Sequence, residues 1–209
     1  MIKALCFNIA HDCNMSCRYC FAGKGTFGGL RSMMTKEAAF KGIDFLIQNS
    51  GQRKNCEIDF FGGEPLLNFT IIRETVDYAR KEGRKKGKEF KFTLTTNGLL
   101  LDEEVMDFVN QEKFSIVLSL DGRREVNDLV RILKDGRGSY DLLADRYISF
   151  VEKRRHEDYF IRGTYTRHNL DFSRDLQHLV NLGVKSISLE PVVGPSNLPY
   201  ALKEGDLNY

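Results

Sequence analysis

Strand patterns and helix patterns alternate along almost the whole chain, and this alternation limits the folds that are open to it. The strand patterns lie at 3–9, 56–61, 90–96, 114–120, 159–166 and 184–190. Helical patterns with one apolar face lie at about 35–49, 68–86, 102–111, 139–154 and 171–182. Strands that are joined through helices pair in parallel, so the sequence predicts an α/β fold with a parallel sheet. A barrel, a partial barrel and a doubly wound open sheet all fit this order.

The polar residues within the strands separate these possibilities. Side chains alternate across a strand, and five of the six strands have one apolar and one polar face. A sheet that is covered by helices on both faces has nearly continuous apolar strands, so helices are expected on one face only. A closed eight-stranded barrel fills its lumen with bulky branched side chains, which these strands do not supply. We therefore expect a partial (β/α)6 barrel of six parallel strands, with helices outside and an open polar lumen.

The composition is that of an ordinary globular chain, and it excludes several protein classes. The 209 residues are 42% hydrophobic and 29% charged, and the formal net charge is +2. These values argue against intrinsic disorder and against a protein that coats nucleic acid. No stretch approaches the roughly 18 apolar residues of a membrane helix, and the apolar start lacks a cleavage site for export. We expect a cytoplasmic protein that has neither nucleic acid nor a membrane as its partner.

Three of the five cysteines are clustered. Cys13, Cys17 and Cys20 form a C-x3-C-x2-C pattern just after the first strand, at the sheet edge where α/β folds place ligands. In a reducing compartment, clustered thiols indicate metal ligands or catalytic thiols. Three thiolates can hold three corners of an iron–sulfur cluster and leave one iron open to a small chelating ligand. Together with His11, they could instead form a structural zinc site.

Three further motifs stand at or just after the ends of strands. They are FFGGEPLLN at 60–68, TTNG at 95–98 and SLDG at 119–122. In this order, behind CNMSCRYC at 13–20, they resemble the signature of radical S-adenosylmethionine (SAM) enzymes over nearly the whole chain. Within that superfamily the chain looks most like the peptide-modifying branch with C-terminal SPASM or twitch extensions. KALCFNIAHDCN and EPVVG resemble the SCIFF maturases, which install thioether crosslinks in a small cysteine-rich ribosomal peptide.

The resemblance implies a 4Fe-4S cluster that is held by Cys13, Cys17 and Cys20, with its fourth iron chelated by the amino and carboxylate groups of SAM. Twelve residues then have an implied role in binding SAM: Tyr19, Phe21, Ala22, Gly62, Gly63, Glu64, Thr96, Asn97, Ser119, Asp121, Arg131 and Val192. The GGE motif would receive the amino group, because glycines allow close approach and a carboxylate suits an ammonium group. Ser119, Asp121 and Arg131 would bind the ribose and the carboxylate, for which an arginine is suited. Tyr19, Phe21 and Ala22 would line the adenine pocket, and the backbone near Val192 would close it.

The resemblance implies an oxidoreductase that cleaves SAM reductively to a 5′-deoxyadenosyl radical, which abstracts hydrogen from a substrate carbon. The expected partners are a cysteine-rich precursor peptide and an electron donor of the flavodoxin or ferredoxin type. No residue is assigned to proton or hydrogen transfer. The alternatives are another maturase, such as an anaerobic sulfatase-maturase-like enzyme, and a zinc or iron–sulfur binding module without catalysis.

Several residues receive no role from the sequence. Cys6 and Cys56 lie in strands and are expected to be small core residues, although the position of Cys6 also allows it to face the cleft. Arg162, Thr164 and Glu190 lie on the expected polar face, where they would contact SAM or substrate or form a structural network.

The chain departs from the family in two respects. Asn127 and Asp128 stand where a His-Asp pair is common, which weakens any inference about substrate contacts at 127–135. No cysteine follows Cys56, whereas SPASM-type maturases carry further cysteines for auxiliary clusters. We therefore expect residues 1–209 to be the radical SAM catalytic core, without a SPASM domain or an N-terminal peptide-recognition domain.

Overall fold

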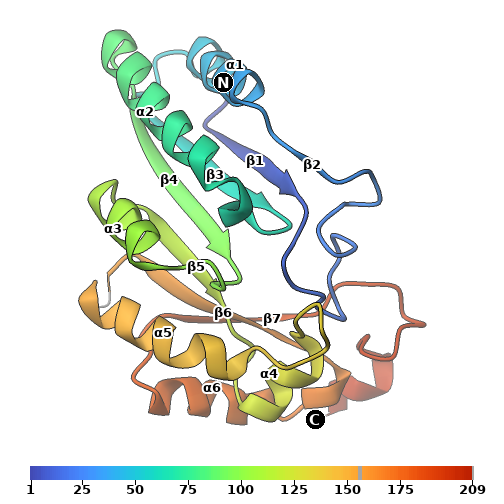
Figure 1. Ribbon diagram of the computed structural model, residues 1–209. Coiled ribbons are helices and arrows are strands. Elements are labelled where there is room, and N and C mark those ends of the chain that lie inside the picture. The colour runs from blue at the N-terminus through green and yellow to red at the C-terminus, as the bar shows by residue number, and fades with distance from the viewer. Residues whose placement is uncertain (155–156, 209) are drawn as a thin grey trace.

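The computed structural model describes residues 1–154 and 157–208, and its centre is one curved sheet (Figure 1). The strand order is β2-β1-β3-β4-β5-β6-β7, and every neighbouring pair is parallel except β1 with β2. The strands are β1 (Ala4–His11), β2 (Ser32–Met33), β3 (Asn55–Gly62), β4 (Glu89–Thr96), β5 (Ser115–Ser119), β6 (Tyr159–Tyr165) and β7 (Ile187–Pro191). The six predicted parallel strands and the open α/β architecture are thus confirmed.

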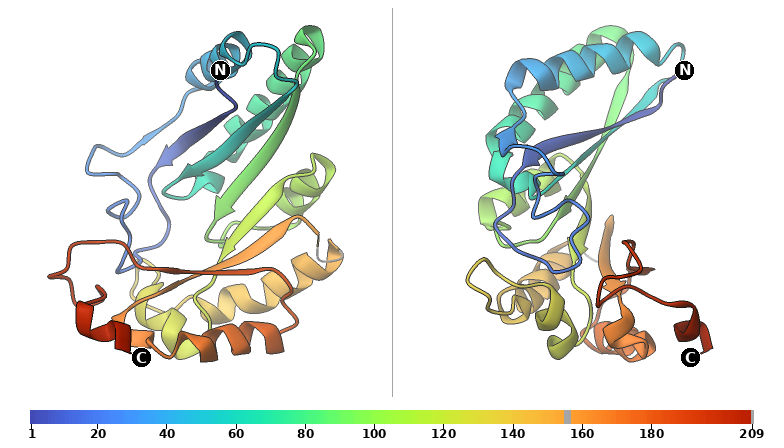
Figure 2. Two further views of the ribbon diagram at one scale, coloured as in Figure 1. Left: turned by 180° about the vertical axis from the view of Figure 1, so that it is seen from behind. Right: turned by 90° about the vertical axis from the view of Figure 1, so that its right-hand side faces the viewer.

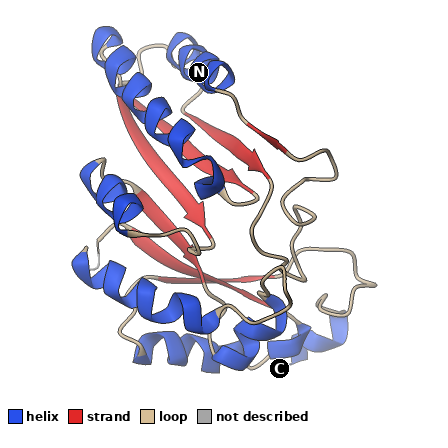
Figure 3. Ribbon diagram, in the orientation of Figure 1, coloured by secondary structure: helices blue, strands red, loops and turns tan. Residues whose placement is uncertain are grey.

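The helices lie on the outside of the curve (Figure 3). They are α1 (Lys36–Asn49), α2 (Phe69–Lys86), α3 (Glu103–Gln111), α4 (Arg124–Val130), α5 (Tyr140–Lys153) and α6 (Phe172–Asn181). Short 3-10 helices are η1 (Pro65–Asn68), η2 (Arg167–Asn169) and η3 (Glu204–Asn208). Seen from behind, β1, β3 and β4 lie in front of α2, and none of the described helices covers this face of these three strands (Figure 2). None of the helices in the described part of the chain has the length and apolarity that crossing a membrane requires.

The five predicted helices are present, whereas α4 and the antiparallel β2 were not predicted. α4 has only seven residues and β2 only two, so neither contains enough residues to show a period. The predicted strand at 184–190 begins later, at Ile187, because Val184 closes the end of α6: its N–H donates to the Leu179 carbonyl at 3.2 Å.

The apolar faces of the strands and the inner faces of the helices form the core. In β4 the even-numbered residues are buried, whereas the odd-numbered ones are exposed or half-buried. The rings of Phe60 in β3, Phe92 in β4 and Phe114, just before β5, stack on one another at centroid distances of 5.3–6.0 Å. The opposite faces carry Asp59, Thr93 and other polar groups, as the alternation predicts. The core therefore lies between sheet and helices, and the concave face stays polar.

Candidate cofactor-binding site

A cavity of about 350 Å³ lies at the carboxyl ends of the parallel strands. This volume is within the range of small-molecule and cofactor sites. Of the fifteen residues that the sequence singles out for the cluster and SAM, thirteen line the cavity: Cys13, Cys17, Tyr19, Cys20, Phe21, Ala22, Gly62, Gly63, Thr96, Asn97, Ser119, Arg131 and Val192. The structure thus brings together motifs that are spread over the whole length of the chain.

The cysteine loop is anchored to the segment that follows α4. The N–H groups of Ser16 and Arg18 donate to the carbonyls of Ile132 and Val130 at 2.9 and 2.8 Å. The N–H of Cys20 donates to the Cys17 carbonyl at 3.3 Å, which closes a turn within the loop. These bonds fix the loop across one end of the cavity.

The thiols of this loop sit in an environment that suits metal ligands. Burial raises the pKa of Cys13 to about 11 and also raises that of Cys17, so both are protonated at neutral pH. Coordination to a metal deprotonates such a thiol outright. The Sγ of Cys13 already accepts hydrogen bonds from the N–H of Met15 at 3.4 Å and the side-chain amide of Asn97 at 3.6 Å. The donor set therefore fits an iron–sulfur cluster, whose ligand sulfurs accept such bonds.

His11, which would be the fourth ligand in the zinc alternative, is not among the residues that line the cavity with the three thiols, and its ring lies 5.2 Å from the ring of Phe27.

Gly62 and Gly63 bring the end of β3 close to the end of β1. Gly62 has φ +135, and a Cβ there would lie 2.5 Å from the Ala10 carbonyl oxygen. A Cβ on Gly63 would lie 2.1 Å from the carbonyl oxygen of Asp12, next to the first cysteine. Close approach of a ligand is one reason for glycine at these two positions. The packing of the cysteine loop against them is a second reason.

Glu64 is fully buried and is not among the cavity-lining residues. Its carboxylate accepts hydrogen bonds from the Thr96 hydroxyl at 2.7 Å, the Asn97 N–H at 2.8 Å and the Leu66 N–H at 3.0 Å. Burial raises the pKa of Glu64, and these hydrogen bonds oppose the rise. The side chain thereby ties β3 to the end of β4 and orients Thr96 and Asn97 on the cavity wall.

Tyr19, Asp121 and Arg131 form a second buried polar group. The Tyr19 hydroxyl donates to Asp121 at 2.7 Å, and the Arg131 guanidinium donates to the same hydroxyl at 2.9 Å. Asp121 also accepts the N–H of Thr164 at 3.0 Å, so it stands behind the wall while Tyr19 and Arg131 line it. The Nε of Arg131 is buried and has no hydrogen-bond partner among residues 1–154 and 157–208. Because an unpaired buried donor is costly, this atom indicates a place for an anionic ligand group such as a carboxylate.

Aromatic and apolar side chains form the mouth of the cavity. Phe21 and Val193 are 73% and 79% exposed, and the ring of Phe21 stacks on that of Phe61 at 6.3 Å. Phe61, like Thr95 and Pro191, lines the cavity but was missed by the sequence reasoning. Two features of the sequence could have identified Phe61. Its position in the alternation of β3 places it on the polar face, and it directly precedes the two glycines.

The residues without an assigned role now have positions. Arg162 and Glu190 pair with each other and line the cavity, as does Thr164. Cys56 is buried in the core, as predicted, but the core prediction is wrong for Cys6, which is exposed. The reason is its register: Cys6 is paired with Asp59, on the polar face of the sheet.

Comparison with known proteins agrees with these features. A family model described as the Radical SAM superfamily matches residues 7–153. The chain is similar to an uncharacterised protein of Methanocaldococcus jannaschii, with 31% identity over 191 residues, which is 90% of this chain and 62% of that protein. It is 29% identical over 178 residues to the radical SAM cyclopropyl synthase TigE of Paramaledivibacter caminithermalis, covering 76% of this chain and 37% of that protein.

A further relative is the cysteine-type anaerobic sulfatase-maturating enzyme of Clostridium perfringens, with 32% identity over 127 residues, which is 57% of this chain and 32% of that protein. The solved structure of native anSMEcpe with bound AdoMet and Kp18Cys peptide has the same fold, with a TM-score of 0.87 at 22% identity. That comparison covers 99% of this chain and 57% of the solved one. The chain thus spans less than two thirds of the length of each of these proteins.

Proposed function

The chain belongs to the radical SAM superfamily, and on this premise we propose that residues 1–209 are the catalytic core of an enzyme that forms thioether crosslinks in a cysteine-rich precursor peptide. The superfamily gives the enzyme its cofactors, a 4Fe-4S cluster and SAM. The observation that carries the proposal is a single cavity that contains three cysteine thiols and an unpaired arginine donor.

In this proposal Cys13, Cys17 and Cys20 ligate the cluster, and Arg131 pairs with the carboxylate of SAM through its free Nε. A carboxylate there would supply the partner that this buried donor lacks. The buried charge of Glu64, behind the wall, favours an ammonium group at the surface of the wall.

The remaining wall residues orient the nucleoside. The exposed ring of Phe21 and the backbone near Val192 enclose a flat adenine, beside the buried Ala22. Ser119 offers its hydroxyl to the ribose, and Asp121 holds Tyr19 in place. When bound, the reduced cluster and SAM supply a 5′-deoxyadenosyl radical that abstracts a hydrogen atom from a substrate carbon. The chain itself supplies position and the exclusion of water.

A peptide substrate is supported by the relatives. One similar structure contains a bound peptide, and one relative matures a protein, as its name states. The similarity to a sulfatase-maturating enzyme also favours a second candidate, the oxidation of one cysteine side chain in a protein substrate. Both candidates need a one-electron donor, for which we propose a flavodoxin or ferredoxin. The five free thiols fit the reducing cytoplasm.

The test is anaerobic cluster reconstitution followed by incubation with SAM and a strong reductant. We expect 5′-deoxyadenosine from the wild type, and neither product nor the iron signal of a site-differentiated cluster from Cys17→Ala. Cys56→Ala is the matched control, because this thiol is buried away from the cavity and should leave the cluster intact. A fully loaded wild-type cluster that releases no 5′-deoxyadenosine would contradict the enzyme assignment.

The substrate class is tested separately with a cysteine-rich precursor peptide in the same reaction. Crosslinking predicts a product that has lost the hydrogen atoms removed by bond formation and resists alkylation at the linked cysteine. Conversion of a single cysteine to an aldehyde would favour the sulfatase-maturase candidate instead.

A further inference from the structure

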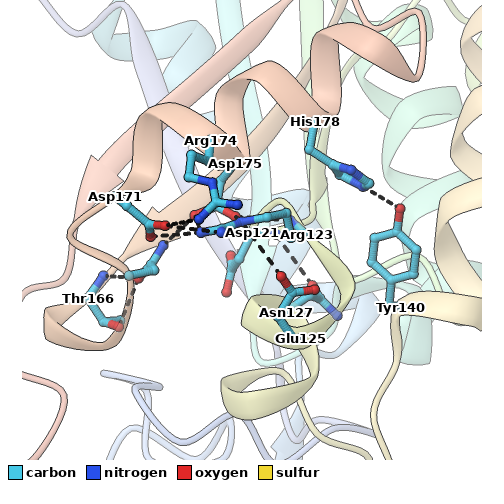
Figure 4. Close-up of polar contacts among 11 residues, drawn as sticks. Asp121, Arg123, Glu125, Asn127, Tyr140, Thr166, Asp171, Arg174, Asp175 and His178 are labelled. Atoms are coloured by element: carbon cyan, nitrogen blue, oxygen red, sulfur yellow. Dashed lines mark hydrogen bonds and ion pairs between the residues drawn. The ribbon is translucent and has the colours of Figure 1, made fainter.

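A buried carboxylate on the outer helix layer, Asp175 of α6, accepts four hydrogen bonds (Figure 4). Three come from Arg123: its backbone N–H at 3.1 Å, its Nε at 2.7 Å and one terminal nitrogen at 3.3 Å. The fourth comes from the side-chain amide of Asn169 at 3.0 Å. The carboxylate of Asp171, one turn earlier, accepts hydrogen bonds from the two terminal nitrogens of the same guanidinium at 2.7 and 3.1 Å. The two aspartates therefore hold Arg123 against α6 from two directions, and we call Arg123, Asp171 and Asp175 the clamp.

The turn that contains Gly122 and Arg123 packs directly against Asp175. Gly122 has φ +122, and a Cβ at this position would lie 2.3 Å from the Cβ of Asp175. Only glycine permits both this conformation and this contact. Asp121, the residue before it, is the acceptor of the Tyr19 hydroxyl at the cavity. The backbone therefore connects the clamp directly to Asp121, close to the end of β5.

A continuous set of hydrogen bonds leads from the clamp to the cavity wall. The carbonyl of Arg123 accepts the N–H of Asn127 at 2.9 Å, and the carbonyl of Asn127 accepts the N–H of Arg131 at 2.7 Å. The side-chain oxygen of Asn127 accepts the N–H of Asp121 at 3.3 Å. Its amide nitrogen donates to the hydroxyl of Ser139, which donates to the carbonyl of Arg131 at 2.8 Å. The fully buried Asn127 therefore links Asp121 to Arg131, and its role in the site is structural.

This arrangement matters because α4 has little stability of its own. It has seven residues, and Arg123 at its N-cap makes no side-chain capping bond. Helices this short are marginal unless tertiary contacts hold them. The position of Arg131, directly after the last residue of α4, depends on what holds the start of the helix.

We propose that Asp175 is a positioning residue for the cofactor site: through Arg123 it fixes the start of α4, and so holds Asp121 behind the cavity wall and Arg131 in the wall, where Arg131 meets SAM. This inference rests on the proposed function only for the identity of the ligand. The positioning itself is a property of the chain without cofactor.

The test uses Asp175→Asn, which keeps the size of the side chain, and Arg123→Gln, which removes the clamp from the other side. Arg80→Gln is the matched control, because the Arg80 guanidinium also bonds a carboxylate, that of Glu112, together with the Phe90 carbonyl, at the opposite ends of the strands. All proteins are reconstituted, and iron content, melting temperature and the dissociation constant of SAM are measured. We expect SAM to bind roughly tenfold or more weakly to both clamp variants, at wild-type iron content. Arg80→Gln should lose comparable thermal stability but keep wild-type affinity.

Hydrogen exchange of the cofactor-free proteins provides the second measurement. We expect faster exchange at 121–131 in both clamp variants and not in Arg80→Gln. Clamp variants that keep wild-type affinity, or unchanged exchange at 121–131, would overturn the inference. If the wild type binds no SAM, the proposed function fails, and exchange alone decides whether Asp175 positions this segment.

Discussion

Asn97 connects the buried carboxylate of Glu64 to the cysteine loop. Its backbone N–H donates to Glu64 at 2.8 Å, and its side-chain amide donates to Asn14 at 2.7 Å and to the Sγ of Cys13 at 3.6 Å. Its side-chain oxygen accepts the N–H of Leu99 at 3.0 Å. These hydrogen bonds hold the residue in one orientation, with its side-chain amide toward the Cys13 sulfur.

Removing this donor should change the redox properties of the cluster. Hydrogen bonds to cluster sulfurs stabilise the reduced, more negative state, so Asn97→Ala should lower the midpoint potential by an amount on the order of tens of millivolts. Potentiometric titration that is followed by electron paramagnetic resonance measures this shift. Asn181→Ala, at the end of α6, is the control and should keep the wild-type potential. An unchanged potential in Asn97→Ala, with the cluster intact, would show that the amide does not act on the sulfur.

At the scale of elements, the turns after a strand and after a helix are shaped by glycines that differ in their surroundings. Gly98, after β4, has φ +76, and a Cβ there would lie 2.2 Å from the ring of Tyr147. Gly87, after α2, has φ +65 and open space around it. The two positions share their backbone conformation and differ in packing.

Substituting alanine at these two positions distinguishes the energetic cost of backbone strain from the cost of a steric clash with a neighbouring side chain. Gly87→Ala should lower the free energy of unfolding by about 1 kcal/mol, the usual effect of a left-handed conformation on a residue with a Cβ. Gly98→Ala should cost roughly 2–4 kcal/mol, because the buried Tyr147 must also move. Denaturant titration measures both values. Equal losses would mean that Tyr147 adapts without cost.

The elements also show what sequence patterns can and cannot predict. The parallel strands and long helices were predictable, because each buries a face with its own period. α4 could not be predicted in this way, since it is short and is held by Arg123 and Asp175, which are far apart in the sequence. The motifs identified most of the cavity wall, but they could not show that the carboxylates of Glu64 and Asp121 lie behind it, because that depends on which neighbours donate to them.

At the scale of the whole molecule, the cavity joins both ends of the sheet. Its walls include the cysteine loop after β1 and Val192 after β7, whereas β1 and β7 themselves are not paired in the described part of the chain. A ligand in this position contacts both halves of the fold at once. Its binding energy therefore adds to the stability of the entire chain.

SAM should accordingly raise the melting temperature of the cluster-loaded protein. At a concentration of about 100 times the dissociation constant, the gain is about 2.7 kcal/mol, which corresponds to roughly 5–10 °C for a chain of this size. Thermal unfolding under anaerobic conditions at increasing SAM measures it. Cys17→Ala, which lacks the cluster, should show a much smaller rise. An equal rise in that variant would place the binding of SAM outside the cluster.

The open sheet has a further consequence for the proposed peptide substrate. β2 and β7 are its two edges, and no strand-to-strand hydrogen bonds close the gap between them in the part of the chain that the structure describes. A closed barrel admits a polypeptide only by its end or as a narrow hairpin at the rim. We expect the open sheet to admit an internal segment of the proposed precursor from the side, so that a residue in the middle of a long precursor reaches the cavity while both flanks stay outside.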